Sequence, residues 1–318
     1  MLAPATARAF FSIGLACFPW ITLAEQPTVS IKPRAVRLRP KAPPADIRVD
    51  IKLTVIPVTV TDPLGVPYPG LKREDFRLFE DGVEQEVRYL SSDDSPVSVG
   101  VVFDASQSME GKIGQSRAAV SRFFTTSVPG DEFFLVEFND APRMLCEFTS
   151  DTDLIEKSLV NIQPKNWTAL FDAVYMGVHK MKRAKNPRKA LLILSDGGDN
   201  YSRYTQSEMK SLVREADVSI YSIALVGGGL LRRHVGMLRS LSDQTGGHVY
   251  DVEKMSELPE AVARASAAIR NQYLLAYVSS NPNNDGLYRK IQVRMNPRPD
   301  LPRLHASWRS GYYAPGEQ

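Results

Sequence analysis

A regular alternation of apolar runs and helix-like segments between residues 97 and 270 limits most strongly the folds open to this chain. Runs typical of buried strands recur at VSVGVVFD, FFLVEF, RMLCEF, KALLILSDG, VSIYSIALV and GHVYDV. Amphipathic segments of helical length separate most of them, at SRAAVSRFFTTSV, ALFDAVYMGVHKMK, EMKSLVREAD and HVGMLRSLSDQT. Strands that alternate with helices favour an open, mostly parallel sheet covered on both faces. We therefore predict a doubly wound, Rossmann-like α/β domain with a six-stranded sheet over residues 97–270.

The connection between the second and third apolar runs sets the direction of one strand. Only NDAP, residues 139–142, separates these two runs. A parallel crossover needs a much longer connection, so this one joins antiparallel strands, and we expect an antiparallel edge strand. In the order 3-2-1-4-5-6, strands one and four are neighbours where the winding reverses, and ligands bind outside their carboxyl ends.

Segments with β patterning flank this central region. Residues 46–96 contain the alternating run IRVDIKLTVIPVTVTD and a hairpin pattern, FRLFEDGVEQEVRYL, that turns at Asp81 and Gly82. Residues 271–314 contain YLLAYVSS, YRKIQVRM and RLHASWRSGYY. About four and about three strands, respectively, are too few to form separate domains, because each apolar face needs a covering layer. We expect the two segments to pair into one small β-sandwich, with the α/β domain inserted between them.

The first 24 residues have the pattern of an export signal. Arg8 precedes the apolar run AFFSIGLACFPWITLA, which ends in small residues suited to cleavage after Ala24. This run is interrupted by Pro19 and is shorter than the ~20 residues that span a bilayer. We predict an exported protein, periplasmic or extracellular. A lipoprotein anchor at Cys17 is the alternative.

Residues 25–45 form a basic, proline-rich linker. They hold five prolines and show no helical period, which is typical of a semi-rigid, extended segment. A solvated tether is the expected role, and a weak contact with an anionic envelope surface is the alternative. The whole chain carries a net charge of only +3, so composition does not indicate a nucleic-acid-binding protein. Without the signal, Cys146 is the single cysteine and no internal disulfide is expected.

Oxygen-bearing side chains follow two of the predicted strands and precede one of the predicted helices. Asp104 ends VSVGVVFD and is followed by Ser106 and Ser108, whereas Asp196 ends KALLILSD. Thr168 lies at the start of a helix, on the loop that leaves the third strand. Carboxylates and hydroxyls without His or Cys suit Mg²⁺, Ca²⁺ or Mn²⁺ rather than zinc. We predict one divalent cation, Mg²⁺ first, with Ca²⁺ and Mn²⁺ as alternatives. Because neutral hydroxyls leave it net positive charge, a carboxylate of another protein is its natural further ligand.

This pattern resembles the von Willebrand factor type A domain and its metal-ion-dependent adhesion site (MIDAS). The resemblance covers residues 97–270 and implies direct coordination by the hydroxyls, with the acids often acting through water. Family members usually carry glycine where this chain has Trp167, which either crowds the site or forms part of its rim. Residues 58–82 and 271–315 resemble the flanks of a bacterial exported family built around this domain. The five implied ligand positions are Asp104, Ser106, Ser108, Thr168 and Asp196.

Four of the five predicted ligands also have a purely structural alternative. Ser106 and Ser108 suit turn or N-cap positions before a helix near Lys112, Thr168 suits a helix cap, and Asp196 suits a turn beside two glycines. Jointly, their order along the chain at the correct strand ends favours the metal site.

Motifs for catalysis or dinucleotide binding are missing from the sequence. It has no G-x-S-x-G motif, and its four histidines lie in unrelated segments. A second acid two residues after Asp104, as an aspartate phosphotransferase would need, is replaced by Ser106. VGGGLL does not match G-x-G-x-x-G and follows the fifth strand. We expect no enzyme, no catalytic or dinucleotide-binding residues, and an adhesion-type module that captures Asp or Glu of a partner protein. The alternative is a structural envelope component in which the metal only stabilises loops.

Overall fold

The computed structural model describes residues 53–316 except residues 64, 93–94, 227–231 and 300–301. The predicted signal segment with Cys17 and the proline-rich linker lie outside the described residues. Within the described ranges, no helix combines the length and the apolar character that crossing a membrane requires.

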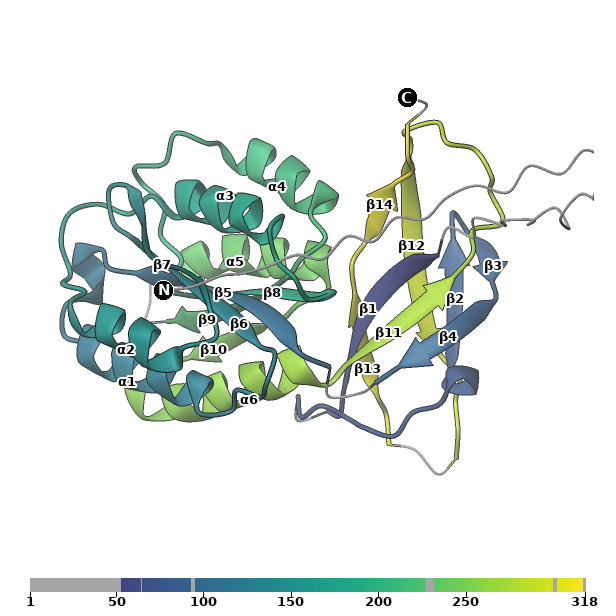
Figure 1. Ribbon diagram of the computed structural model, residues 1–318, viewed down its shortest axis with the longest axis horizontal. Helices are drawn as coiled ribbons and strands as arrows, with labels where there is room; N and C mark the ends of the chain where they lie inside the picture. Colours follow the sequence, from purple (N-terminus) through teal and green to yellow (C-terminus); the bar gives the residue numbers. More distant parts are fainter. Residues whose placement is uncertain (1–52, 64, 93–94, 227–231, 300–301, 317–318) are drawn as a thin grey trace, which may run out of the picture. The chain divides into compact units, whose positions relative to one another are not determined.

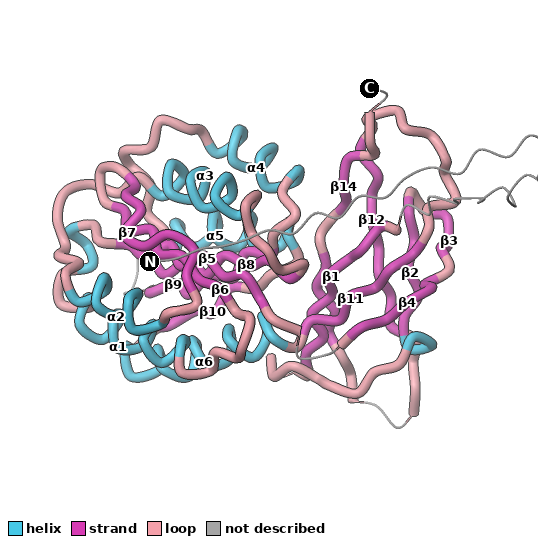
Figure 2. Tube along the Cα trace, in the orientation of Figure 1, coloured by secondary structure: helices cyan, strands magenta, loops and turns pink. Residues whose placement is uncertain are grey.

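The central region forms a six-stranded sheet in the order β10-β9-β8-β5-β6-β7 (Figures 1 and 2). If β5 to β10 are numbered one to six along the chain, the order from β7 to β10 is the predicted order 3-2-1-4-5-6. Only β7 runs antiparallel, paired with β6 across the short connection at residues 139–141. The predicted fold class is therefore confirmed. The strands are β5 (Val97–Asp104), β6 (Glu132–Phe138), β7 (Pro142–Thr149), β8 (Arg188–Ser195), β9 (Ser219–Leu225) and β10 (Val249–Val252).

Helices cover both faces of this sheet. One apolar cluster joins it to α1 (Ile113–Phe124), α2 (Thr152–Val160) and α6 (Leu258–Arg270). A second cluster joins the other face to α3 (Leu170–Met181), α4 (Gln206–Glu215) and α5 (Arg232–Thr245). Helix α2 was not predicted. It lies between β7 and residue 168, so Thr168 does not follow the third strand directly, contrary to our expectation.

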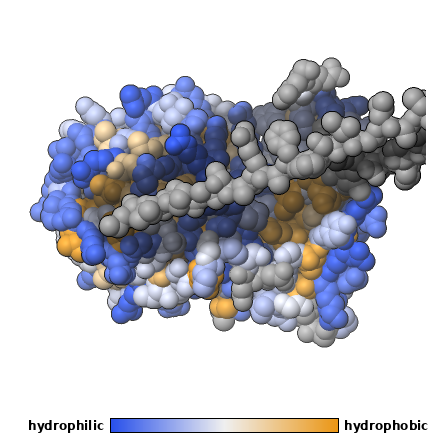
Figure 3. All heavy atoms as spheres, in the orientation of Figure 1, coloured by the Kyte–Doolittle hydropathy of each residue, from blue (hydrophilic) through white to orange (hydrophobic). Residues whose placement is uncertain are grey.

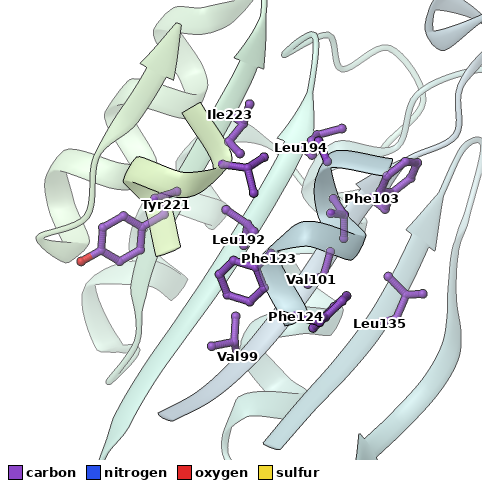
Figure 4. Close-up of a cluster of buried hydrophobic side chains, with 14 of the residues drawn as sticks. Val99, Val101, Phe103, Phe123, Phe124, Leu135, Leu192, Leu194, Tyr221 and Ile223 are labelled. Carbon is purple, nitrogen blue, oxygen red and sulfur yellow. The ribbon is translucent and has the colours of Figure 1, made fainter. Parts of the chain in front are cut away.

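Strand β5 is buried along its whole length, which explains its continuous apolar sequence. Gly100 leaves space on one face, because a Cβ there would lie 2.1 Å from the ring of Phe134. The opposite face of the sheet carries the larger apolar cluster, the one shared with α1, α2 and α6. On the face of the molecule in Figure 3, most of the described surface is hydrophilic. Figure 4 shows this cluster between the sheet and α1, with Val99, Val101, Phe103, Phe123, Phe124, Leu135, Leu192, Leu194, Tyr221 and Ile223.

The flanking segments build two four-stranded sheets that share one apolar core. One has the order β13-β1-β11-β4 and the other β14-β12-β2-β3, so each contains strands from both segments. The predicted pairing of the two segments is confirmed, although the second segment supplies four strands because RLHASWRSGYY divides in two. The strands are β1 (Thr54–Thr61), β2 (Phe76–Glu80), β3 (Val83–Gln85), β4 (Val87–Ser91), β11 (Gln272–Tyr277), β12 (Tyr288–Met295), β13 (His305–Trp308) and β14 (Gly311–Tyr313).

The predicted hairpin turns at Asp81 and Gly82, whose φ angles of 49° and 84° are both left-handed. Two such residues form the tight turn that matches the twist of a hairpin. Its second arm is shorter than expected. Residues 83–85 pair with β2, but residues 87–91 pair with β11 in the other sheet. The chain therefore passes between the two sheets at Glu86.

Candidate metal site

Asp104, at the end of β5, is the buried anchor of the site, with no exposed surface. Its Oδ1 accepts a hydrogen bond from the backbone N–H of Ser106 (2.9 Å), and its Oδ2 accepts one from Ser195 Oγ (2.5 Å). Burial raises the pKa of the Asp104 carboxyl to about 6, although hydrogen bonds from Ser106 and Ser195 oppose the rise and Asp196 adds to it. The protein groups thus compensate only partly for placing a negative charge here.

The two serines differ in exposure but contact each other. Ser106 is buried and Ser108 is exposed, and their Oγ atoms lie 3.0 Å apart. Ser106 precedes a short 3-10 turn without a side-chain capping bond, and Lys112 occupies the N-cap position of α1. Neither hydroxyl therefore caps a helix, which removes the capping alternative for both.

Thr168 is held by Asn200, a residue whose role sequence reasoning missed. The N–H of Thr168 donates to Asn200 Oδ1 (2.9 Å), and the N–H of Asn200 donates to the carbonyl of Thr168 (3.0 Å). Ala169, rather than Thr168, is the N-cap residue of α3. The only feature of the sequence that could have indicated this role was the position of Asn200, four residues after Asp196 on the loop leaving β8.

Asp196 carries the most informative atom of the site. The residue is 2% exposed, and the N–H of Gly198 approaches its Oδ1 at 3.4 Å. Its Oδ2 is buried and has no hydrogen-bond partner among the described residues. Lys112 Nζ lies 3.7 Å from this oxygen, as an ion pair whose lysine side chain is 22% exposed. An unbonded buried carboxylate oxygen beside a second buried carboxylate is a place where a cation fits.

Three predicted ligands, Ser108, Thr168 and Asp196, line one cavity of about 530 Å³. Asp104 and Ser106 join them through the hydrogen bonds above, so the fold brings all five residues to the same rim. Metal coordination by them stays a prediction. Within the described ranges, no three His, Cys, Asp or Glu side chains cluster as metal ligands; the predicted site has two. The other lining residues are Gln107, Asn166, Trp167, Gly198 and Asn200.

A family model described as the von Willebrand factor type A domain matches residues 99–198. This range holds all five predicted ligands, and the observed sheet order agrees with the fold. The central region of this chain is a von Willebrand factor type A domain. The narrower resemblance of its flanks to a bacterial exported family stays a prediction. None of the curated proteins matches the sequence significantly.

Solved structures of similar fold include other type A domain proteins. A von Willebrand factor type A protein from Catenulispora acidiphila has a TM-score of 0.50 and 11% identity, and the match covers 83% of this chain and 74% of that one. Proximal thread matrix protein 1 from the mussel byssus has a TM-score of 0.50 and 18% identity, covering 60% of this chain and 51% of its own. A second structure of the mussel protein, with a TM-score of 0.50 and 18% identity over 60% of this chain and 50% of its own, is described as having a zinc-occupied MIDAS motif. At these identities the likeness shows the fold alone.

Proposed function

We propose that this chain is an exported binding protein whose type A domain holds one divalent cation and uses it to capture an acidic side chain of a partner protein. The observation that carries the proposal is the buried, unbonded Oδ2 of Asp196 near a second buried carboxylate, Asp104. Two such carboxylates repel each other and lose hydration, so a cation between them and the hydroxyls stabilises the arrangement.

The donor set supports a hard cation, Mg²⁺ first, with Ca²⁺ or Mn²⁺ as alternatives. Ser106, Ser108 and Thr168 would hold it directly, and Asp104 and Asp196 through water, as the family resemblance implies. When bound, the ion supplies the positive charge that attracts a carboxylate from outside. The zinc-occupied MIDAS motif of the mussel protein supports a divalent ion in this fold. We propose binding rather than catalysis, and export through residues 1–24.

A chelator-controlled pull-down from envelope extract tests this proposal against a purely structural role of the metal. We expect a partner to be retained in Mg²⁺ and released by EDTA, while circular dichroism shows the same fold in both conditions. Retention that persists in EDTA, together with a lower melting temperature, would favour the structural envelope component instead.

Replacing both serines with alanine tests whether they serve partner binding or the stability of the fold. Ser106→Ala with Ser108→Ala removes both partners of one hydrogen bond, so neither hydroxyl is left unpaired and the cost to stability is small, about 1 kcal/mol or less. We expect the double variant to keep the melting temperature of the wild type within a few degrees and to lose partner binding in the same pull-down. A variant that unfolds at room temperature but binds normally after refolding would make the serines structural.

A further inference from the structure

Trp167 is a large aromatic side chain displayed beside the candidate metal site. It is 60% exposed and lines the same cavity as Ser108, Thr168 and Asp196. The sequence left open whether Trp167 crowds the site or forms part of its rim. The structure shows that it forms part of the rim. A side chain this exposed contributes little to the core, so the described structure gives Trp167 no evident role in packing.

The backbone is fixed after Trp167 by the bonds between Thr168 and Asn200, and before it by two further backbone bonds. The N–H of Lys165 donates to the carbonyl of Ala105 (2.9 Å), and the N–H of Gln107 donates to the carbonyl of Asn166 (3.1 Å). Asn166 is one of two non-glycine residues described with a left-handed φ (60°), and its Nδ2 donates to Asp140 Oδ2 (3.1 Å). The bonds to Ala105 and Gln107 attach the tryptophan loop to the segment that carries the two serines, and the bond to Asp140 attaches it to the connection between β6 and β7.

A fixed loop with an exposed tryptophan has the properties of a binding hot spot. Tryptophan is enriched among the residues that dominate interface energies. A side chain on an ordered backbone loses less conformational freedom when it is covered, so more of the contact energy appears as affinity. The cavity of about 530 Å³ also exceeds the needs of an ion and one carboxylate, because a water molecule occupies only ~30 Å³ of liquid.

We propose that the partner segment presents its acidic residue together with an aromatic or large apolar residue, and that this second side chain packs on Trp167. The proposal rests on the proposed function, because the ion positions the acid. The occupant that we propose is an extended peptide segment of a partner protein. Alternate side chains of an extended segment share one face at a spacing of ~7 Å, so the acid and the apolar residue are expected two positions apart.

Selection from a displayed random-peptide library tests the proposal with the full chain. The library is bound in Mg²⁺ and eluted with EDTA, once on the wild type and once on Trp167→Ala. On the wild type we expect enrichment of Asp or Glu with Phe, Tyr, Trp or Leu nearby, most often two residues away. On Trp167→Ala we expect acidic enrichment alone, with at least tenfold weaker binding of the best wild-type peptide.

Two further variants control for the loss of an aromatic ring at position 167 and for the loss of an exposed aromatic elsewhere. Trp167→Phe retains a ring and is expected to keep the aromatic enrichment, whereas Tyr89→Ala removes an aromatic of similar exposure (62%) from β4 in the sandwich and is expected to change nothing. Acidic enrichment without an apolar neighbour, or the same enrichment on Trp167→Ala, overturns the inference and leaves the proposed function standing. No EDTA-sensitive enrichment at all overturns the proposed function, and the inference with it.

Discussion

Both acids of the site are buried, but they are compensated differently. Asp104 accepts hydrogen bonds at both oxygens, whereas one oxygen of Asp196 faces only the ammonium of Lys112 at 3.7 Å. Lys112 therefore neutralises part of the site's negative charge from inside the chain. A divalent ion at the same carboxylates would be repelled by this ammonium. Lys112 therefore either moves away when the ion binds or lowers the affinity of the site for the ion.

Replacing Lys112 tests this competition. We expect Lys112→Met to bind Mg²⁺ or Mn²⁺ about tenfold more tightly, which corresponds to about 1.4 kcal/mol. The metal-free variant should be slightly less stable than the wild type, because the two carboxylates lose their counter-charge. Calorimetric titration and thermal melting measure the two effects.

Arg122→Met provides the matched control, since Arg122 is an exposed cation on the same helix, ten residues along it. It is expected to leave ion affinity unchanged. Equal affinities of the wild type and Lys112→Met would show that the lysine does not compete for the site.

At the scale of elements, Asp131 ties the start of the central sheet to the end of its last helix. Its Oδ1 accepts a hydrogen bond from the N–H of Val97 at the start of β5 (2.9 Å), and its Oδ2 accepts one from Arg270 at the end of α6 (2.7 Å). The Asp131 side chain is fully buried and that of Arg270 is 17% exposed. One carboxylate thus holds together the two points where the chain enters and leaves the α/β domain.

Removing this carboxylate should destabilise the protein markedly. We expect Asp131→Ala to lower the free energy of unfolding by about 2–4 kcal/mol, because it leaves a largely buried guanidinium without its partner. Asp251→Ala breaks the half-exposed Arg239–Asp251 pair and should cost less than about 1 kcal/mol. Denaturant unfolding of both variants gives the comparison, and similar losses for the two would contradict the assigned role of Asp131.

The sequence allowed the strand order of the central sheet, its antiparallel edge strand and the meeting of the five oxygen-bearing residues to be predicted, because each depends on local patterning and a general topological rule. It did not reveal helix α2, whose start depends on Asp151 accepting hydrogen bonds from two backbone N–H groups. It also did not reveal the division of the second hairpin arm at Glu86, since both halves carry strand patterning. The roles of Asn200 and Lys112 depend on tertiary contacts that spacing along the chain does not encode.

At the scale of the whole molecule, the two β segments depend on each other. Strand β11 lies between β1 and β4, and β12 lies between β14 and β2. Removal of residues 271–318 takes away the strand partners of β1 and β4 and uncovers core side chains such as Ile56 and Val58, both fully buried. We expect this truncated chain to aggregate, whereas residues 95–270 alone should stay soluble, as measured by light scattering after size-exclusion chromatography. A soluble, monomeric truncation would contradict the mutual dependence of the two segments.

The central claim is one divalent-ion site at the rim formed by β5 and β8. Calorimetric titration of Mg²⁺ and Mn²⁺ into the full chain, Asp104→Ala and the isosteric Asp104→Asn tests it most directly. We predict one ion per chain for the wild type, with stabilisation of ~2.7 kcal/mol at a hundredfold excess over Kd, and no binding by either folded variant. Equal binding by the wild type and the variants would contradict the site.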